Sequence, residues 1–343
     1  MSMGSTLHGI ASRAKASGPG RMLRYARASH ERTGIPTAIL FADIGLCKAR
    51  RDIGPMEYYG YGFAGKPSKL RDTYMTTKMN LTLVREFNDY EKRKRFEDKV
   101  AFLEDFSVFS GRDWIDLRTS PDSEKLHSFL RSHEFVFVKP TDDFGGHGIE
   151  RIETAKIADA TELYRRLVVE GKMLLEEAIE PHPEMCRISP NAVSTLRICT
   201  FRRDGKPHHM YTVLRVGVGD AAVDNATSGG LFGPVDDDGI LRCPLYSGTE
   251  GTPYLAHPTT GVVFDGFEIP MMKQAVELCL EASGVVPEVA YVGWDIAITP
   301  TGPVLVEGNP IPGFDMPQWR NQSPEDVGML PKFEQVLGRK IML

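Results

Sequence analysis

Three side chains that could coordinate a cation stand in one short segment: Asp295, Glu307 and Asn309. Carboxylate and amide oxygens are the ligands that hard divalent cations prefer, and Mg²⁺ usually takes one or two carboxylates and leaves its other positions to water and phosphate. Apolar residues surround both acids, so their burial would cost several kcal/mol without a compensating partner. The segment therefore predicts a magnesium site, with exposed strand acids near a turn as the alternative.

The element expected to position these side chains is a β-hairpin, because apolar runs flank the loop Pro300-Thr301-Gly302. A three-residue hairpin loop commonly ends in a glycine in the left-handed conformation. If Thr299 pairs with Pro303, the two acids lie opposite one another. The amide then projects from the same face, because strand side chains repeat every two residues.

A lysine at the end of a short apolar strand could neutralise phosphate. Phe135-Val136-Phe137-Val138 leads into Lys139, and Gly145-Gly146-His147-Gly148 follows shortly after. Glycine N–H groups can approach phosphate oxygens while the ammonium group neutralises charge. The lysine precedes the glycines, so this is neither a Walker A loop nor a Rossmann turn. A glycine-rich hairpin without a ligand is the alternative.

A second predicted strand, over residues 173–175, runs into Glu176 and Glu177 and then into Pro181-His182-Pro183-Glu184. Such a segment can present backbone groups to the edge of an adenine, with a following acid near ribose hydroxyls. A strand followed by an exposed turn is the alternative.

Two arginines stand inside apolar strands, Arg197 in residues 195–200 and Arg215 in residues 214–217. A guanidinium group there needs an anionic partner, either a structural carboxylate or a transferred phosphoryl group. Two such arginines favour the phosphoryl group. The polar, glycine-rich loop that follows, residues 224–230 with Asn225, could line a substrate or be a plain surface loop.

The elements around these residues predict an α+β protein. Strands are expected over residues 135–138, 173–175, 196–201, 209–216, 290–298 and 304–306, and helices over residues 159–170 and 270–283. The chain before them reads as helical, with a break at Gly34-Ile35-Pro36. The tyrosine- and glycine-rich segment 54–74 favours packing over a substrate wall.

Composition excludes several other classes of protein. The formal charge is only −5 over 343 residues, which does not indicate a nucleic-acid partner. The five cysteines form no C-x-x-C pair and read as buried, reduced thiols. No apolar run reaches the length of a membrane span, so a cytoplasmic location is the default.

Taken together, the order of these motifs resembles the ATP-grasp superfamily, and more narrowly its sugar-transfer-associated branch. The motifs are Lys99 in EDKVAFLEDF, VKP at Lys139, TLRICT at Arg197, VDNATSGG at Asn225, and GWDIA followed by GPVLVEGN. The resemblance covers about residues 54–330. It departs from the family at Ser194, where relatives usually carry asparagine.

The resemblance implies an ATP-grasp fold, in which two α+β subdomains hold ATP between them. It implies a helical extension over 1–90 and an ATP-grasp domain over 91–343, with a lid at about 135–180 and a metal-binding part at about 190–330. Carried over by position, Lys99 and Lys139 would contact the phosphates, and the glycine-rich loop would close over them. Glu176, Glu177 and Ile179 would contact adenine, and His182 or Glu184 the ribose.

The function implied is ATP-dependent ligation of a small-molecule carboxylate to an amine through an acyl phosphate, in a polysaccharide or specialised-metabolite setting. Mg²⁺, with Mn²⁺ as a substitute, would be held by the three oxygen ligands, and Arg197, Arg215 and Asn225 would be catalytic. A small-molecule kinase with Asp143 or Asp224 as base is one alternative, and a non-catalytic nucleotide-binding module is the other. The sequence leaves the oligomeric state open, a homodimer included.

Overall fold

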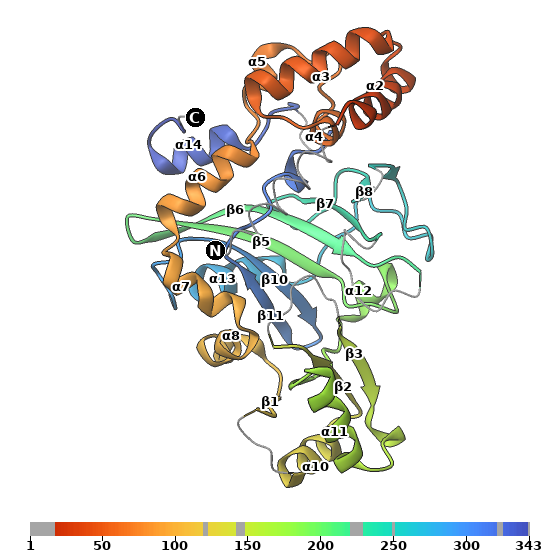
Figure 1. Cartoon of the computed structure of the whole chain (residues 1–343), viewed down its shortest axis with the longest axis vertical. Helices are drawn as coiled ribbons and strands as arrows, with labels where there is room; N and C mark the ends of the chain where they lie inside the picture. Colours follow the sequence, from red (N-terminus) through yellow and green to blue (C-terminus); the bar gives the residue numbers. More distant parts are fainter. Residues whose placement is uncertain are drawn as a thin grey trace. The chain divides into compact units, whose positions relative to one another are not determined.

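The structure is a computed structural model that describes residues 18–118, 123–141, 148–219, 229–248, 251–320 and 325–341. The chain divides into two compact units (Figure 1). Unit 1 combines Met1–Val84 with Gly313–Leu343, and unit 2 comprises Arg85–Pro312. The domain boundary predicted at residue 90 and the subdomain limits stay predictions.

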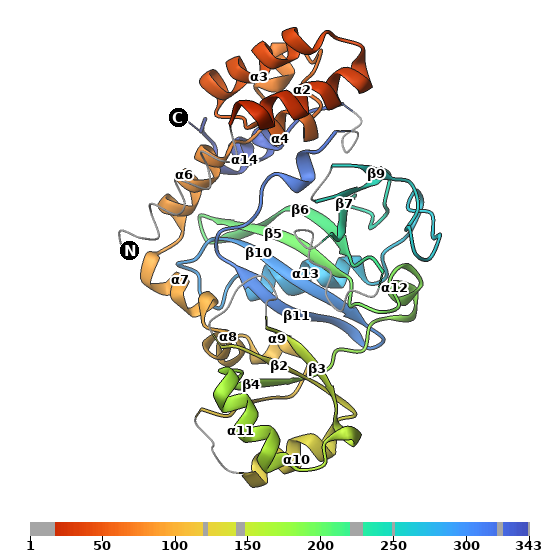
Figure 2. The ribbon, with the colours of Figure 1, turned by 45° about the vertical axis from the view of Figure 1, so that its right-hand side comes forward.

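Unit 2 contains, within its described residues, a small four-stranded sheet. Its strand order is β1 (Trp114–Asp116), β4 (Leu174–Glu177), β2 (Phe135–Lys139), β3 (Glu150–Glu153), and every neighbouring pair is antiparallel. Helices α10 (Ser123–Ser132) and α11 (Ala160–Glu170) lie beside it (Figure 2). Leu126 of α10 and Leu167 of α11 pack with Val136 and Val138 of β2, because alternate strand residues face the helices.

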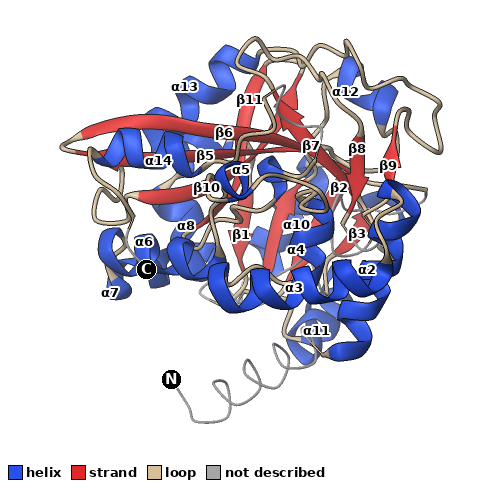
Figure 3. Cartoon of the chain, turned by 90° about the horizontal axis from the view of Figure 1, so that it is seen from above, coloured by secondary structure: helices blue, strands red, loops and turns tan. Residues whose placement is uncertain are grey.

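The larger sheet of unit 2 has seven strands among the described residues, and every neighbouring pair is antiparallel. Figure 3 shows its strands from above, in red. Their order is β11 (Gly302–Asn309), β10 (Tyr291–Thr299), β5 (Thr195–Arg203), β6 (Lys206–Val216), β7 (Leu231–Val235), β8 (Leu245–Ser247), β9 (Pro253–Tyr254). Strand β11 is therefore an edge strand. The other helices in the described residues of unit 2 are α7 (Tyr90–Glu97), α8 (Lys99–Asp105), α9 (Ser107–Ser110), α12 (Pro183–Ile188), α13 (Met272–Ala282) and the 3₁₀ turn Thr154–Lys156.

One face of the larger sheet is apolar and forms the main core. Its strand residues are Leu196, Ile198, Leu214, Val216, Trp294, Ile296, Ile298 and Leu305. Helix α13 packs on this face through Ala275 and Cys279, and Phe102 and Phe106 join the same cluster. Alternation sends the intervening side chains to the opposite face, which can therefore carry charge without disturbing the core.

The predicted elements of unit 2 are confirmed, with shifted ends. All six predicted strands and both predicted helices are present. The five cysteines carry free thiols, and all but Cys186 are fully buried, as expected. No helix in the described ranges combines the length and apolarity needed to cross a membrane.

Unit 1 is helical in its described residues. It contains α2 (Pro19–Thr33), α3 (Thr37–Arg51), α4 (Pro55–Gly60), α5 (Ser68–Arg71), most of α6 (Thr77–Phe87), the 3₁₀ turn Met316–Gln318 and α14 (Leu330–Leu337). The predicted break is confirmed, since Gly34 ends α2 with φ of 73° in the left-handed region. The rings of Tyr58, Tyr61, Phe63 and Tyr74 are buried within the unit, which favours a packing role for that segment.

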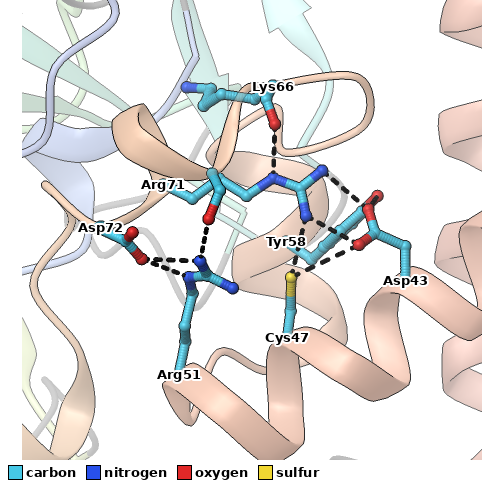
Figure 4. A network of polar contacts seen from close by, with 8 residues as sticks. Asp43, Cys47, Arg51, Tyr58, Lys66, Arg71 and Asp72 are labelled. Atoms are coloured by element: carbon cyan, nitrogen blue, oxygen red, sulfur yellow. Dashed lines mark hydrogen bonds and ion pairs between the residues drawn. The ribbon is translucent and has the colours of Figure 1, made fainter.

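A polar network ties α3 to the tyrosine-rich segment of unit 1 (Figure 4). Arg71 pairs with Asp43 through two bonds of 2.8 and 2.9 Å, and Tyr58 donates its hydroxyl to the same carboxylate. The remaining Nε of Arg71 donates to the carbonyl of Lys66 at 2.8 Å. Every charged group in this network therefore has a partner from unit 1 itself.

Candidate active site

Two arginines converge on one aspartate on the charged face of the larger sheet. Arg197 donates Nε to Oδ1 of Asp295 and Nη2 to Oδ2 at 2.9 Å, and Arg215 donates Nη1 to Oδ2 at 2.9 Å. Asp295 and Arg197 are only 3% and 7% exposed. Burial alone would raise the pKa of Asp295, but the two guanidinium groups overcome this effect and hold the pKa well below its usual range. Asp295 is therefore ionised.

Strand pairing explains why these side chains meet. Asp295 of β10 lies directly opposite Arg197 of β5, and Arg215 of β6 pairs with Thr195, one diagonal step away. Gly293 clears the space beside them, because a Cβ there would lie 3.0 Å from Cδ of Arg197. The sequence favoured a transferred phosphoryl group over a structural carboxylate as the anionic partner of the two arginines, whereas in this structure the partner is the internal carboxylate of Asp295.

Glu307 of β11 lies opposite Asp295 on the same face, as predicted. Glu307 keeps an exposed surface, while the neighbouring protein displaces part of the water around its carboxylate. Loss of water and the neighbouring charge of Asp295 raise the pKa of Glu307 to about 7, against the lowering effect of the two arginines. A cation bound between this carboxylate and the ionised Asp295 would stabilise the negative charge of both.

The route to this pairing differs from the prediction. Thr299 pairs with Gly302, not with Pro303, so the loop has two residues and Gly302 begins β11 with φ of 154°. From the turn to Ile296 opposite Leu305 the ladder is one step out of the predicted register. A β-bulge then inserts Val306 as an extra residue and restores the predicted opposition of the two acids.

Asn309 completes the predicted donor set at the end of β11. Its position opposite Gly293 puts it on the strand face that carries Glu307. The side-chain oxygen of Asn309 accepts from the N–H of Ile311 at 2.9 Å, which orients it and leaves one lone pair available. An amide and two carboxylates thus lie on one face, in the combination that the sequence predicted.

The predicted phosphate ligands lie at the neighbouring small sheet. Lys139 pairs with buried Glu176 at 2.7 Å. Lys99, at the start of α8, donates Nζ to the carbonyl of Pro140 at 2.8 Å. Pro140 directly follows Lys139, so the side chain of Lys99 reaches the chain next to Lys139. The structure brings both lysines together at the end of β2.

Arg112, whose side chain is buried, is a residue at this site that sequence reasoning missed. It pairs with Glu176 at 2.6 Å, so this carboxylate faces two cations. Burial alone would raise the pKa of Glu176, but Arg112 and Lys139 lower it to about 2. The one available signal was Gly111, a helix-ending glycine directly before the arginine; nothing near Arg112 in sequence pointed to its partners.

The adenine and ribose candidates lie along the segment that follows β4. Glu177 and Ile179 line a cavity of about 590 Å³, together with Arg112, His133 and the hairpin loop Pro300-Thr301. The carboxylate of Glu177 accepts from the N–H of Asp113 at 3.0 Å, so the side chain points toward β1.

The ribose candidates have local partners around the start of α12. His182 is the N-cap of this helix, because its Nδ1 accepts from the N–H of Glu184 at 3.1 Å. Glu184 pairs with Arg187. Contacts of these residues with a nucleotide stay predictions.

Several predicted residues lie outside the described residues: Gly145, Gly146, His147, Asn225 and the alternative bases Asp143 and Asp224. Gly148 is described and takes φ of 71°, a left-handed conformation that suits glycine. Ser194, the position at which the sequence departs from the expected family pattern, is buried, and its hydroxyl makes no hydrogen bond within the described part of the chain.

The comparison with family models decides the relationship. The model described as sugar-transfer associated ATP-grasp matches residues 78–336. The chain belongs to this family. Its fold class is accordingly the α+β ATP-grasp fold with helical residues before it, as predicted. None of the curated proteins matches the sequence.

Solved structures with a similar chain path include D-alanyl-alanine synthetase A from Vibrio cholerae, at 15% identity and a TM-score of 0.40, covering 73% of this chain and 62% of that one. The ATP-grasp ligase PsnB with a minimal precursor is 12% identical, with a TM-score of 0.43, and the match covers 74% of this chain and 63% of that one. The D-cycloserine synthetase DcsG is 14% identical, with a TM-score of 0.43, and the match covers 73% of this chain and 71% of that one. This chain thus spans less than two thirds of the first two.

ATP and Mg²⁺ are the standard cofactors of ATP-grasp ligases. The chemistry of the donor set fits Mg²⁺, because Asp295, Glu307 and Asn309 offer oxygen only and leave positions for water and phosphate. The raised pKa of Glu307 fits as well, since a cation bound there would favour the ionised carboxylate. Lys139 at the end of β2 and Lys99 at the start of α8 are cations that suit the phosphate groups of ATP.

Proposed function

We propose that this ATP-grasp protein is an ATP-dependent ligase that joins a small-molecule carboxylate to an amine through an acyl phosphate. The observation that carries the proposal is the convergence of Arg197 and Arg215 on Asp295, directly opposite Glu307. Two cations and two carboxylates on one sheet face can bind a metal and a phosphoryl group together. A place in polysaccharide or specialised-metabolite biosynthesis rests on the family description alone.

In the proposed reaction a substrate carboxylate oxygen attacks the γ-phosphorus of ATP, and the bond from that phosphorus to the β,γ-bridging oxygen breaks to release ADP. The amine then attacks the acyl carbon, the carbon–oxygen bond to phosphate breaks, and the amine proton leaves with the departing phosphate. Asp295, Glu307 and Asn309 would hold Mg²⁺, which would supply neutralisation of phosphate charge when bound.

The residues of this chain act by position and charge. Lys99 and Lys139 neutralise the triphosphate, and Arg215 stabilises charge on the transferred phosphoryl group and on the tetrahedral intermediate. Arg197 shares this task but is more deeply buried, and its two bonds to Asp295 also hold that carboxylate in place. Asn225 remains a proposed contributor.

The test is to incubate the protein with ATP, Mg²⁺ and pooled amino acids and sugar acids, and to identify the products. Ligation yields ADP, inorganic phosphate and an amide in equal amounts. A kinase would yield ADP and a phosphorylated acceptor without free phosphate, and a binding module would yield neither. Either of these outcomes would overturn the proposal.

Nucleotide binding is tested separately through Lys139. Lys139→Met removes a cation expected to face phosphate, where loss of one partner of a desolvated charge pair costs about 2–5 kcal/mol. Calorimetry should show a correspondingly weaker affinity for ATP. Lys156→Met is the matched control, because Lys156 lies on the surface and pairs with Glu153. Unchanged affinity in Lys139→Met would remove this lysine from the nucleotide site.

A further inference from the structure

Arg112 joins the small sheet to the edge of the larger one. Besides its ion pair with Glu176 of β4, its Nη1 donates to the carbonyl of Leu305 at 2.7 Å and its Nη2 to the carbonyl of Val306 at 3.2 Å. The side chain is only 4% exposed. A single buried guanidinium group thus contacts a nucleotide-site candidate on one sheet and the metal-site hairpin on the other.

The two carbonyls that Arg112 contacts lie at the β-bulge. In a regular strand successive carbonyls point to opposite edges, so one side chain at one edge cannot donate to both. Here Val306 is the extra residue between the pairs Ile296–Leu305 and Asp295–Glu307, and both carbonyls accept from the outer edge of β11. Arg112 therefore supplies the donors that a bulged edge strand lacks.

The bulge decides which face Glu307 occupies. If the ladder continued from Ile296–Leu305 without the extra residue, Val306 would pair with Asp295 and Glu307 would pair with Trp294. Since Trp294 lies on the apolar face, a one-residue slip would turn Glu307 into the core. The metal-site carboxylate faces the arginines only because the bulge is present.

The sequence around Arg112 is built for this approach. Helix α9 ends at Ser110, and Gly111, which caps it, has φ of 57°. A Cβ at Gly111 would lie 2.5 Å from Cγ1 of Val304, so the chain passes closer to β11 than any other residue would allow. The main chain is thereby held against the edge strand where the next residue carries the guanidinium group.

We propose that Arg112 is a positioning residue that clamps the β-bulge of β11 and so keeps Glu307 on the metal-binding face, anchored to the small sheet through Glu176. The inference rests on the proposed function, because it assigns Glu307 to Mg²⁺. It adds a consequence: the nucleotide-site carboxylate and the metal-site hairpin are coupled by one side chain. Loosening Arg112 should therefore weaken the response of ATP binding to Mg²⁺ more than ATP binding itself.

The experiment measures ATP affinity by calorimetry without Mg²⁺ and with about 5 mM Mg²⁺, an excess over the nucleotide. It also measures amide hydrogen exchange of residues 304–309. In wild type, Mg²⁺ should tighten ATP binding roughly tenfold or more. In Arg112→Lys, whose single ammonium group cannot span two carbonyls and a carboxylate, this enhancement should fall below about threefold. Exchange at 304–309 should rise by about tenfold or more.

The matched control is Arg118→Lys, because Arg118 pairs with Asp116 at the end of β1 at 3.0 Å but is 41% exposed. It should keep both the Mg²⁺ enhancement and the exchange pattern of wild type. A merely structural Arg112 would lower the melting temperature and leave the Mg²⁺ enhancement intact, which would overturn the inference.

Other outcomes separate this inference from the proposed function. If wild type binds no ATP, the proposed function fails and the inference with it; if wild type responds to Mg²⁺ and Arg112→Lys responds equally, only the inference fails. Should Arg112→Lys not fold, Arg112→Gln is the second variant, since its amide can still donate to one carbonyl. If neither variant folds, Arg112 is required for folding itself, and its assignment as a positioning residue for Glu307 is overturned.

Discussion

Unit 1 and unit 2 each contain an aspartate paired with arginine, and the two networks differ in the charged groups that lie next to that pair. In unit 1, Asp43 faces one arginine and a tyrosine hydroxyl, and all of these groups are satisfied locally. In unit 2, Asp295 faces two arginines, and a second carboxylate, Glu307, lies opposite it. An arginine–aspartate ion pair alone therefore does not mark a functional site.

The pKa values of the carboxylates express this difference. Burial would raise the pKa of Asp43, but hydrogen bonds from Arg71 and Tyr58 lower it below its usual range. The pKa of Glu307 is raised, because loss of water and the neighbouring Asp295 outweigh the arginines. The negative charge of Asp43 is therefore compensated by its partners. The surroundings of Glu307 instead disfavour its ionised form, and a bound cation would stabilise that form.

The sharpest way to break the comparison is to remove the same charge from both networks with Asp295→Asn and Asp43→Asn. Removing one partner of a buried ion pair costs about 3–5 kcal/mol, and less for Asp43, whose side chain is 26% exposed. Both variants should lose stability in denaturant titrations. Only Asp295→Asn should also lose turnover, by roughly 10³-fold or more per folded molecule. Equal turnover in the two folded variants would contradict the distinction.

Glu307→Gln should separate catalysis from stability within unit 2. Turnover should fall by roughly 10²–10³-fold, because a metal ligand loses its charge without a change in volume. Stability should move the other way. A raised folded-state pKa stabilises the protein at low pH, and this contribution is lost as pH rises through the folded pKa.

The measurement for Glu307→Gln is turnover at saturating Mg²⁺ together with stability at pH 5 and pH 8, roughly either side of the shifted pKa. The variant should be at least as stable as wild type at pH 8, and this advantage should shrink at pH 5. A variant that is strongly destabilised at pH 8, yet fully active, would show that Glu307 belongs with Asp43 as a structural carboxylate.

Arg215→Met tests whether the second arginine distinguishes unit 2. Arg215 makes one bond to Asp295, while Arg197 makes two. Because Asp295 keeps its closer partner, stability should change little. The value of kcat should fall by roughly 10²–10³-fold with ATP affinity almost unchanged, as for loss of one group that stabilises transition-state charge. A destabilised variant with normal kcat would leave Arg197 as the catalytic candidate.

The sequence was sufficient for the parts of the site that local patterns encode. Alternation in the apolar runs predicted that Asp295 and Glu307 share a face, and the arginines inside strands predicted a need for an anion. It could not supply the identity of that anion, because Arg197 and Asp295 meet through strand pairing across 98 positions. Choosing between an internal aspartate and a ligand requires the three-dimensional register.

The bulge shows the limit of such reasoning most clearly. A three-residue loop and a regular ladder predict the same opposition of the acids as a two-residue loop followed by a bulge. The correct face was therefore predicted by an incorrect route. The difference depends on Arg112, whose contacts with Leu305 and Val306 come from a segment with no periodic signal. The short strands β1 and β3 were missed for a similar reason, since three or four residues carry too little alternation.

The smallest expected effect concerns Glu176, a carboxylate that resembles Asp43 although it pairs with Lys139, the lysine proposed to contact phosphate. Burial would raise its pKa, but Arg112 and Lys139 lower it from 4.5 to about 2. A depressed pKa stabilises the folded state above the unfolded pKa, and this stability is lost as pH falls from about 4.5 to about 2. The shift corresponds to about 3 kcal/mol.

Acid titration of stability in wild type and Glu176→Gln measures this contribution, which the glutamine cannot make. The variant should start less stable at pH 7 and lose less on acidification, so the two curves should approach one another near pH 2. Glu150→Gln is the matched control, because Glu150 also pairs with two cations, Arg166 and Lys172, but is 35% exposed and should contribute about 1 kcal/mol or less. Parallel curves for wild type and Glu176→Gln would show that Glu176 is not held ionised by its two partners. In that case Arg112 would have no charged anchor on the small sheet, and the resemblance between Glu176 and Asp43 would be wrong.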